Sequence, residues 1–386
     1  MKKISILIAL RNEERIILSC LENLKRAINE FYQGEKNKNN FEIEILLGDD
    51  NSDDKSAEII NEFIKKNQNT NYTYFKIDKV LNKINQNNLK GKVNVIHQLI
   101  NQSEGETLIL LDADILVNQN WLQELIKKYY QKESIKMVMG TTIPKINQES
   151  FFTNFQTIDW IFGQGVLAIF SKLGFPQTAM GNNLAFDKKI YQELGGYENI
   201  QFSVTEDVAL FKAFQNYING CWWRQQQKKQ NCQTLQSVRQ VSNPQKNKNQ
   251  FFLQLFNSKS LAFTEAELTL KDWILQHHRW FCGAWQFSNF IKKGLLITYL
   301  FRIIFFIGIV VGIFLGGNSY LILAVFTILG INYLLILSFL VKLKLKISLS
   351  IFLQVFLFCL LEQFLYLLVG IHFLKTKKVK WKGREF

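Results

Sequence analysis

Three long apolar segments, at residues 295–317, 320–341 and 348–374, dominate the C-terminal part of the chain. Each has the roughly 20 residues that a helix needs to cross a bilayer, and a soluble core does not call for three in succession. The sequence therefore predicts a membrane part of two to three apolar helices at residues 291–374. The mixed composition of residues 1–290 predicts a folded domain before it.

Lysine and arginine flank these apolar segments, at residues 292–293, at residues 342–346 and in the basic tail, residues 375–386. This distribution follows the positive-inside pattern and accounts for much of the net charge of +14, so we do not expect nucleic acid as a partner. We expect an integral membrane protein whose residues 1–290 and tail face the cytoplasm, at the cell membrane if the source is bacterial. That topology needs an even number of crossings, so the third segment, with Glu362 and Gln363 near its centre, is a candidate for a re-entrant or interfacial helix. The alternative is that the first segment, which contains Arg302, lies flat on the membrane.

Apolar strands alternate with helix-periodic segments in the first part of the chain. Strands are expected at residues 4–10, 41–47, 72–77 and 107–111, and helices at residues 12–25, 56–66 and 93–101. This alternation predicts βαβ units and an α/β fold with a mostly parallel sheet. Ligands of such sheets bind at the carboxyl ends of the strands.

Acidic clusters follow two of the expected strands, at residues 49–54 and at Asp112-Ala113-Asp114. Carboxylates at a strand end can accept hydrogen bonds from a base or ribose, or they can cap the next helix. The second cluster is sharper, because two carboxylates flank one small residue and hard divalent cations prefer oxygen ligands. Asp112 and Asp114 are the predicted ligands of Mg²⁺ or Mn²⁺, with a simple strand-end turn as the alternative.

Two further segments carry polar side chains suited to catalysis, Thr205-Glu206-Asp207 and Gln276-His277-His278-Arg279-Trp280. The first precedes an expected helix at residues 208–217, so its acids can cap that helix or supply a general base. In the second, Arg279 suits a phosphate contact and Trp280 offers an apolar face for a sugar or acceptor. The adjacent histidines are not expected to share a metal, because neighbouring helix residues face different ways.

Two other segments are distinctive in composition. Residues 151–175 are apolar, aromatic and amphipathic, and we expect them to pack on the sheet or to lie at a bilayer interface. Residues 222–254 are rich in Gln, Asn and Lys, and we expect a flexible insertion there. The sequence has neither a Gly-x-Ser-x-Gly motif nor a phosphate-binding P-loop, although Lys92 can reach a ribose or phosphate.

Taken in order, these residues resemble the motifs of the family-2 inverting glycosyltransferases, whose catalytic domain has the GT-A fold. The resemblance covers about residues 4–283. It includes residues 6–14, which have Ala9 where the family usually has Pro, residues 49–54, Gly91-Lys92-x-Asn94, Asp112-Ala113-Asp114, Gly181-Asn182-Asn183, Gly195-Gly196-Tyr197, Thr205-Glu206-Asp207 and Gln276 to Trp280 as Gln-x-x-Arg-Trp. Each piece is weak to moderate alone, but their common order is specific.

The resemblance implies a role for each matched residue. The nucleotide-sugar donor, in this family often a UDP-sugar, would contact Ala9, Glu13, Asp50, Lys92, Asp112, Ala113 and Asp114, with a divalent metal at the two aspartates of Asp-x-Asp. Asp207 would be the catalytic base, and an inverting transfer needs only one base and a cation that stabilises the departing diphosphate. The acceptor and pyrophosphate would contact Gly181, Asn182, Glu206, Gln276, Arg279 and Trp280.

Residues 381–386 resemble the Trp-Arg/Lys-Gly-Arg-x-Tyr ending of lipid and carotenoid glycosyltransferases, with Phe386 in place of Tyr. Gln-x-x-Arg-Trp occurs both in ceramide-type glucosyltransferases and in chitin-, hyaluronan- and cellulose-type synthases. Three apolar segments are few for a polysaccharide channel, so a lipid acceptor is favoured over a processive polysaccharide synthase. Further alternatives are an inactive membrane scaffold of the same fold and a transporter, which would need more spans.

Overall fold

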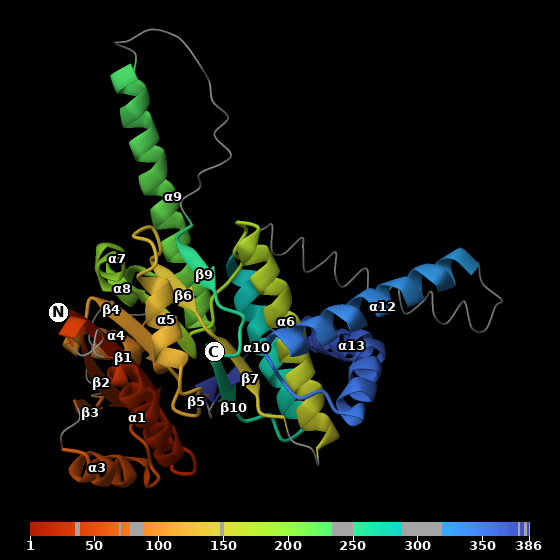
Figure 1. Cartoon of the computed structure of the whole chain (residues 1–386), viewed down its shortest axis with the longest axis horizontal. Helices are drawn as coiled ribbons and strands as arrows, with labels where there is room; N and C mark the ends of the chain where they lie inside the picture. The colour runs from red at the N-terminus through yellow and green to blue at the C-terminus, as the bar shows by residue number, and fades with distance from the viewer. Residues whose placement is uncertain are drawn as a thin grey trace. The chain divides into compact units, whose positions relative to one another are not determined.

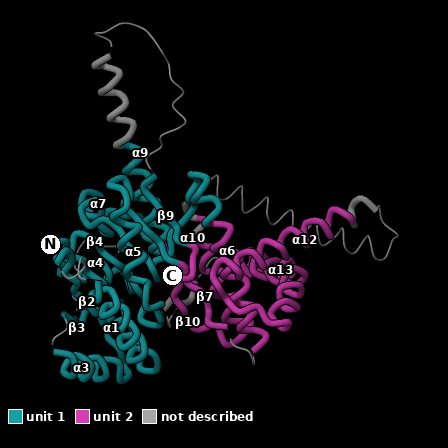
Figure 2. Tube along the Cα trace, viewed as in Figure 1, with its two compact units in different colours: residues 1–140, 168–202, 206–255 teal, residues 141–167, 203–205, 256–386 magenta. Residues whose placement is uncertain are grey.

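The computed structural model describes residues 1–34, 39–68, 71–77, 89–146, 150–233, 250–287, 319–376, 379–381 and 384–385. The chain divides into two compact units (Figure 2). Unit 1 comprises residues 1–140, 168–202 and 206–255, and unit 2 comprises residues 141–167, 203–205 and 256–386. The first predicted apolar segment, residues 295–317, lies outside the described residues, as do residues 382–383 and 386 of the predicted lipid-type ending.

Unit 1 is built on a seven-stranded sheet with the order β3-β2-β1-β4-β8-β6-β9 (Figure 1). Its parallel half consists of β1 (Lys2–Leu10), β2 (Phe41–Asp49), β3 (Tyr72–Lys76) and β4 (Thr107–Leu111). β8 (Asn183–Asp187) runs antiparallel to both β4 and β6 (Met137–Met139), and β9 (Phe252–Gln254) is parallel to β6. The predicted α/β fold with a mostly parallel sheet is confirmed.

Helices connect the parallel strands of unit 1. They are α1 (Ile17–Gln33), α3 (Ser56–Lys66) and α4 (Lys92–Gln102). After the parallel strands, unit 1 continues with the short strand β5 (Leu116–Val117) and the helices α5 (Trp121–Tyr129), α7 (Lys188–Glu193) and α8 (Gly196–Asn199). α1 buries one apolar stripe whose members recur every three to four residues: Ile17, Cys20, Leu21, Leu24, Ala27, Ile28 and Phe31. α4 packs on β1 and β2, where Gly48 allows Val95 to approach the backbone closely.

The strand order reverses between β1 and β4. From β1 the chain moves through β2 to β3 on one side, and it then returns to β4 on the other side of β1. Such a reversal opens a crevice at the carboxyl ends of the two neighbouring strands, where α/β folds bind their ligands. Ala9 is the penultimate residue of β1 and Asp112 directly follows β4, so both lie at the carboxyl ends of these strands.

α9 (Glu206–Gln233) is longer than the sequence patterns predict. The expected helix ends at residue 217, whereas residues 222–233, assigned to the flexible insertion, are helical. Glutamine, lysine and arginine are good helix formers, so their bias away from apolar residues does not interrupt a helix that is already nucleated. Residues 252–254 of the same segment form β9, and residues 234–249 lie outside the described residues.

Unit 2 contains β7 (Thr141–Pro144), which pairs in parallel with β10 (Leu261–Thr264), and the first part of α6 (Phe151–Lys172). It continues with α10 (Leu270–Phe287), α12 (Ser319–Lys342), α13 (Leu349–Lys375) and a hairpin of β11 (Lys380–Trp381) and β12 (Arg384–Glu385). α13 packs against both α10 and α12. α12 and α13 correspond to the second and third predicted apolar segments.

α12 and α13 are the two described helices that are long and apolar enough to cross a membrane, over Leu323–Lys342 and Leu349–Lys375. Many of their large apolar side chains are exposed, as Leu334 (66% exposed) and Leu374 (84% exposed) illustrate, while others, such as Phe358, are buried. The polar Glu362 and Gln363 of α13 are buried too. Exposed apolar side chains together with buried polar ones suit lipid surroundings, so these helices indicate association with a membrane.

A buried carboxylate ties the end of β2 to its neighbours. Asp49 is 1% exposed, and its Oδ1 accepts hydrogen bonds from the backbone N–H and the hydroxyl of Ser52, both at 2.7 Å. Its Oδ2 accepts a hydrogen bond from the hydroxyl of Tyr74 on β3, also at 2.7 Å. Both oxygens of Asp49 are therefore used to hold the sheet edge together.

We predict that Asp49→Ala lowers the free energy of unfolding by about 3 kcal/mol, because it leaves buried donors without an acceptor. Tyr74→Phe, which removes one of these donors, should cost about 1 kcal/mol. Asp53→Ala is the control, since that side chain is 81% exposed and its loss should cost less than about 0.5 kcal/mol. Urea unfolding of the detergent-solubilised protein measures these values, and equal costs for Asp49→Ala and Asp53→Ala would contradict the structural role of Asp49.

Candidate functional site

The loops after β1 and β2 hold each other through reciprocal hydrogen bonds. The backbone N–H of Asn12 donates to Oγ of Ser52 at 3.0 Å, and that of Glu13 donates to Oγ of Ser56 at 2.8 Å. In return, the backbone N–H of Asp53 donates to Oδ1 of Asn12 at 2.9 Å. These bonds fix the two loops that carry the predicted nucleoside contacts.

Asp50 and Asp49 have different surroundings although they are adjacent. Asp49 has both carboxylate oxygens engaged by protein donors, so it serves the fold. Asp50 has its Oδ2 3.8 Å from Nη1 of Arg11, and its side chain is 14% exposed. Of the two acids, Asp50 is therefore the better candidate for a ligand contact, in agreement with the choice made from sequence.

Three of the predicted donor-site carboxylates lie around Cys20 of α1. The Sγ of Cys20 is 3.9 Å from the carbonyl oxygen of Asp112. Burial raises the pKa of the Cys20 thiol most strongly, and the charges of Asp114, Asp112 and Glu13 raise it further. Glu13, from the loop after β1, and the aspartates, from the end of β4, are thus close enough to act on one atom.

Lys92 in the first turn of α4 connects the end of β4 with α9. Its Nζ lies 2.6 Å from Oδ1 of Asp112 and 3.0 Å from Oε1 of Glu206. Burial alone would lower the pKa of Lys92, but the two carboxylates raise it above its ordinary value. Gly91, with a φ of 56°, supplies the left-handed backbone from which the helix starts. Lys92 is therefore a fixed positive charge beside the predicted metal ligands.

Asp207 in the first turn of α9 is held by two backbone donors. Its Oδ2 accepts a hydrogen bond from the N–H of Gly181 and its Oδ1 one from the N–H of Val208, both at 2.8 Å. Burial and the neighbouring charge of Glu206 raise the pKa of Asp207 to about 6, although these hydrogen bonds and Lys92 oppose the shift. The result is an oriented carboxylate that is ionised at neutral pH and more basic than an ordinary aspartate.

The predicted Gln-x-x-Arg-Trp residues lie on α10 of unit 2. Gln276, Arg279 and Trp280 share one face of this helix, because they are three and four residues apart. Nε2 of Gln276 donates to Oε1 of Glu267 at 2.8 Å. Burial raises the pKa of Glu267, while the charge of Arg279 lowers it, so the arginine also lies near this carboxylate. The ring of Trp280 packs 5.2 Å from that of Trp160, measured between centroids.

The two adjacent histidines of this segment have different partners. Nε2 of His277 lies 2.9 Å from Oδ2 of Asp159, whereas Nε2 of His278 lies 2.9 Å from the carbonyl oxygen of Thr376. Each histidine thus contacts a different part of unit 2. Among the described residues, no group of three or more His, Cys, Asp and Glu side chains could hold a metal by itself.

The residues present nevertheless fit a metal that binds together with a ligand. Asp112 and Asp114 provide two carboxylates at one strand end, and hard cations such as Mg²⁺ are commonly bound by one or two carboxylates, with substrate phosphates and water as the other ligands. The donor set therefore suits a cation that arrives with a diphosphate.

Two side-chain oxygens near the predicted acceptor residues lack a partner within the described part of the chain. They are Oδ1 of Asn182 and Oε1 of Gln276, both buried. Buried acceptors of this kind call for an explanation, and a hydroxyl group of a ligand would satisfy them. The first belongs to unit 1 and the second to unit 2.

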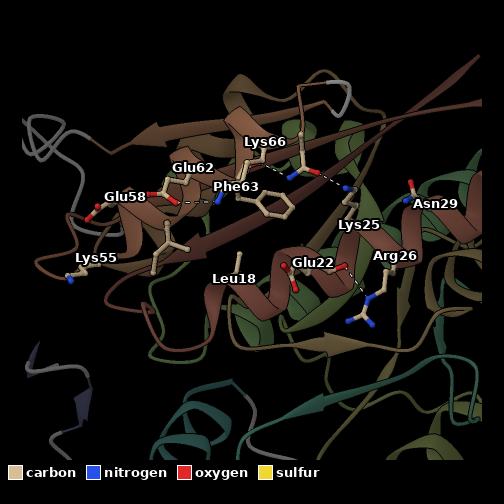
Figure 3. A pocket seen from close by; sticks show the side chains of 12 residues that line it. Leu18, Glu22, Lys25, Arg26, Asn29, Lys55, Glu58, Glu62, Phe63 and Lys66 are labelled. Atoms are coloured by element: carbon tan, nitrogen blue, oxygen red, sulfur yellow. Dashed lines mark hydrogen bonds and ion pairs between the residues drawn. The ribbon is translucent and has the colours of Figure 1, made fainter.

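A groove of about 770 Å³ lies between α1 and α3 (Figure 3), and none of the predicted site residues lines it. Charged side chains of both signs face it, with Phe63 and Leu18 between them. Its charges are partly satisfied internally, since Lys25 donates to Asn67 at 2.5 Å and Lys66 lies 3.6 Å from Glu62. We therefore do not assign the predicted donor, acceptor or metal site to this groove.

Sequence reasoning missed several residues that support the predicted ones: Gln156, Asp159, Glu267 and Tyr366. Asp159 is a lone acid inside an apolar segment, and that is a signal which the sequence does contain. Glu267 lies in a loop without any motif, so its proximity to Gln276 follows only from the folded chain.

The raised pKa of Asp207 has a consequence for stability. Because a folded-state pKa of about 6 exceeds the ordinary 3.8, ionisation opposes folding increasingly from about pH 4 to about pH 6 and fully above that. We predict that Asp207→Asn is more stabilising at pH 8 than at pH 4, by about 1 kcal/mol after allowance for its partial exposure. Thermal unfolding at both pH values, with Asp53→Asn as a surface control, measures this, and an identical effect of Asp207→Asn at the two pH values would contradict it.

Comparisons with known proteins agree on one family. A model described as "Glycosyl transferase family 2" matches residues 5–195, and one described as "Glycosyl transferase family group 2" matches residues 107–361, which is more than half of the chain. The second match extends over Gln276 to Trp280 and into α13.

Three curated relatives illustrate the range of similar proteins. The probable glycosyltransferase YdaM of Bacillus subtilis is 27% identical over 201 residues, which cover 51% of this chain and 43% of that protein. The poly-beta-1,6-N-acetyl-D-glucosamine synthase of Staphylococcus epidermidis is 28% identical over 171 residues, 44% of this chain and 38% of that protein. The beta-monoglucosyldiacylglycerol synthase of Nostoc sp. is 28% identical over 211 residues, 54% of this chain and 40% of that protein. The chain thus aligns with less than half the length of each of these relatives.

Proposed function

Since the chain belongs to glycosyl transferase family group 2, we propose that it is an inverting glycosyltransferase. It transfers a sugar from a nucleotide diphosphate-sugar, such as a UDP-sugar, to a hydroxyl group of a lipid at the cytosolic face of a membrane. The observation that carries the proposal is Asp207, a carboxylate with a pKa raised to about 6 that two backbone N–H groups orient, in the same unit as Asp112 and Asp114.

The donor binds at the crevice between β1 and β4. Glu13 and Asp50 accept hydrogen bonds from the nucleoside, and Ala9 and Ala113 allow it to approach the backbone. Lys92 contributes a positive charge for the diphosphate, which would then compete with the present partners of Lys92, Asp112 and Glu206.

Asp112 and Asp114 hold Mg²⁺ or Mn²⁺ together with the diphosphate. When bound, the cation offsets the negative charge that the departing nucleoside diphosphate acquires. Within the described part of the chain, the ammonium group of Lys92 lies 2.6 Å from Asp112 and is the positive charge beside this carboxylate.

Asp207 is the general base. As the acceptor oxygen forms its bond to the anomeric carbon, the bond from that carbon to the diphosphate oxygen breaks, and the hydroxyl proton passes to Asp207. The diphosphate leaves with the bonding electron pair, so the configuration inverts in one displacement. Because the hydrogen bonds from Gly181 and Val208 keep the carboxylate in one orientation, little reorganisation is needed at the moment of transfer.

Each unit contributes residues for the acceptor and the pyrophosphate. In unit 1 these are Gly181, Asn182 and Glu206, and in unit 2 they are Gln276, Arg279 and Trp280 on one face of α10. The buried oxygens of Asn182 and Gln276 that lack partners in the described part of the chain support this role, because acceptor hydroxyls can donate to them. Trp280 offers an aromatic face and Arg279 a positive charge.

The apolar helices support a lipid as the acceptor. α12 and α13 expose large apolar side chains, and the Nostoc relative is named as a synthase of a glucosyldiacylglycerol. We propose a catalytic part up to about residue 290 that includes the insertion at residues 222–254, an integral membrane part at residues 291–374, and a basic cytosolic tail at residues 375–386. A processive polysaccharide synthase is the second candidate, because the Staphylococcus epidermidis relative bears such a name.

Product analysis tests this function. Membranes that contain the full-length protein are incubated with radiolabelled nucleotide sugars, and we expect one labelled glycolipid in the organic extract. Asp207→Asn should bind the donor normally and lower transfer by about a hundredfold or more, since it removes the base. Wild-type transfer should fall as the pH drops through about 6, because protonated Asp207 cannot accept the proton. A long sugar polymer would refute the lipid acceptor, and an Asp207→Asn enzyme of normal rate would refute the base.

Metal dependence is tested separately through binding. We predict that a chelator abolishes transfer and that Mn²⁺ or Mg²⁺ restores it. Calorimetric titration with a nucleoside diphosphate should show Mn²⁺-dependent affinity that Asp112→Asn and Asp114→Asn each reduce about tenfold or more. Asp53→Asn, at an acid whose side chain is 81% exposed, serves as the control. Unchanged Mn²⁺-dependent affinity in both Asp-x-Asp variants would disprove the metal assignment.

A further inference from the structure

Unit 2 contains a network of hydrogen-bonded polar side chains that joins three helices. Tyr366, on α13, donates its hydroxyl to Oδ1 of Asp159, on α6, at 2.9 Å. Oδ2 of Asp159 lies 2.9 Å from Nε2 of His277, on α10. The side chains of Asp159 and His277 are only 5% and 4% exposed, so no bulk water competes for these bonds. The three helices joined by this network, α6, α10 and α13, can be followed in Figure 1.

Both ring nitrogens of His277 are engaged. Nδ1 faces the carbonyl oxygen of Trp273 at 2.9 Å, and Nε2 faces the carboxylate of Asp159. A carbonyl and a carboxylate are both acceptors, so each ring nitrogen of His277 faces an acceptor oxygen. A buried ring paired in this way keeps one orientation, because turning it would leave the carboxylate without its partner.

The orientation of His277 reaches the predicted acceptor face through Trp280. The ring centroids of His277 and Trp280 are 4.7 Å apart, and Trp280 also packs 5.2 Å from Trp160. Trp160 follows Asp159 directly on α6. The rings of His277 and Trp160 therefore position the indole of Trp280. His277 is held by Asp159, and Trp160 is the neighbour of Asp159 in the sequence.

α6 also supports Gln276, the first residue of the Gln-x-x-Arg-Trp motif. Gln156 bonds both backbone groups of Glu267, with Nε2 donating to the carbonyl oxygen at 2.8 Å and Oε1 accepting from the N–H at 2.9 Å. Glu267 in turn accepts a hydrogen bond from Gln276. Gln156, Asp159 and Trp160 lie three and four residues apart on one face of α6, so a single helix face holds both Gln276 and Trp280.

We propose that Asp159 and Tyr366 are positioning residues for sugar transfer, which fix the Trp280 side of the acceptor site through His277. The apolar helix α13 is then a support of the acceptor site as well as a membrane helix. This inference rests on the proposed function, because the acceptor role of Trp280 does.

The decisive variant is Tyr366→Phe, which removes one hydroxyl and keeps the ring. Tyr333→Phe is its matched control. The hydroxyl of Tyr333, on α12, lies 3.5 Å from the carbonyl oxygen of Phe352, on α13, and so also joins two apolar helices. This contact does not involve the Gln-x-x-Arg-Trp residues or Asp159. Both variants are made in the full chain and reconstituted in lipid. We measure kcat, the KM of donor and acceptor, and the melting temperature.

We expect Tyr366→Phe to lower kcat/KM for the acceptor about tenfold while the donor KM stays within about twofold, because the acceptor side alone is displaced. Tyr333→Phe should stay within about twofold in every parameter. Asp159→Asn should lower kcat/KM for the acceptor further. Adding Tyr366→Phe to Asp159→Asn should cause no additional loss, because the hydrogen-bond network is already interrupted at Asp159. If Asp159→Asn does not fold, Tyr366→Phe decides.

The outcomes separate this inference from the function on which it rests. An active wild-type enzyme whose Tyr366→Phe variant behaves like Tyr333→Phe overturns the positioning role and leaves the function standing. A Tyr366→Phe variant that loses thermal stability and affects donor and acceptor parameters equally also overturns it, because that pattern is merely structural. A folded wild-type protein that transfers no sugar to any acceptor overturns the proposed function, and the inference with it.

Discussion

The parallel pairing of β1 with β4 is the constraint on which the rest of unit 1 depends. Residues 4–7 lie directly opposite residues 107–110, although about one hundred positions separate them in the chain. Because both strands end at the same edge of the sheet, the loop that holds Glu13 and the turn that holds Asp112 become neighbours. α4 and α9 then add Lys92 and Glu206 to the same edge, so that one strand pairing gathers groups from four elements.

The charges at this edge are balanced against one another. Lys92 lies between Asp112 and Glu206, and its charge lowers the pKa of Asp207. Burial and Glu206 act in the opposite direction and prevail, which leaves Asp207 with a pKa of about 6. A carboxyl group tuned in this way is ionised at neutral pH but accepts a proton more readily than an ordinary aspartate, which is the property that general-base catalysis requires. The same burial that makes Asp207 a better base makes its ionisation a cost to folding.

Unit 2 distributes polarity differently from a water-soluble protein. On α6, the polar Gln156 and Asp159 are buried, while Phe151, its first residue, is 46% exposed. α13 likewise buries Glu362 and exposes leucine and phenylalanine. In lipid, polar side chains gain more from partners inside the protein than from the exterior, so hydrogen-bonded groups such as Asp159 and Tyr366 can hold helices together.

The sequence by itself determined the α/β class, the acids at the strand ends and the two described apolar helices, because each depends on local periodicity: two for strands, 3.6 for helices, and about 20 apolar residues for a span. It did not determine that residues 222–233 are helical, since a polar composition is compatible with both a loop and a solvated helix. Nor did it reveal Asp159, Tyr366 or Glu267, whose partners lie up to 207 positions away. Those contacts were decided by the tertiary structure alone, because hydrogen bonds between distant segments form only once helix packing has brought them together, and no local pattern encodes that packing.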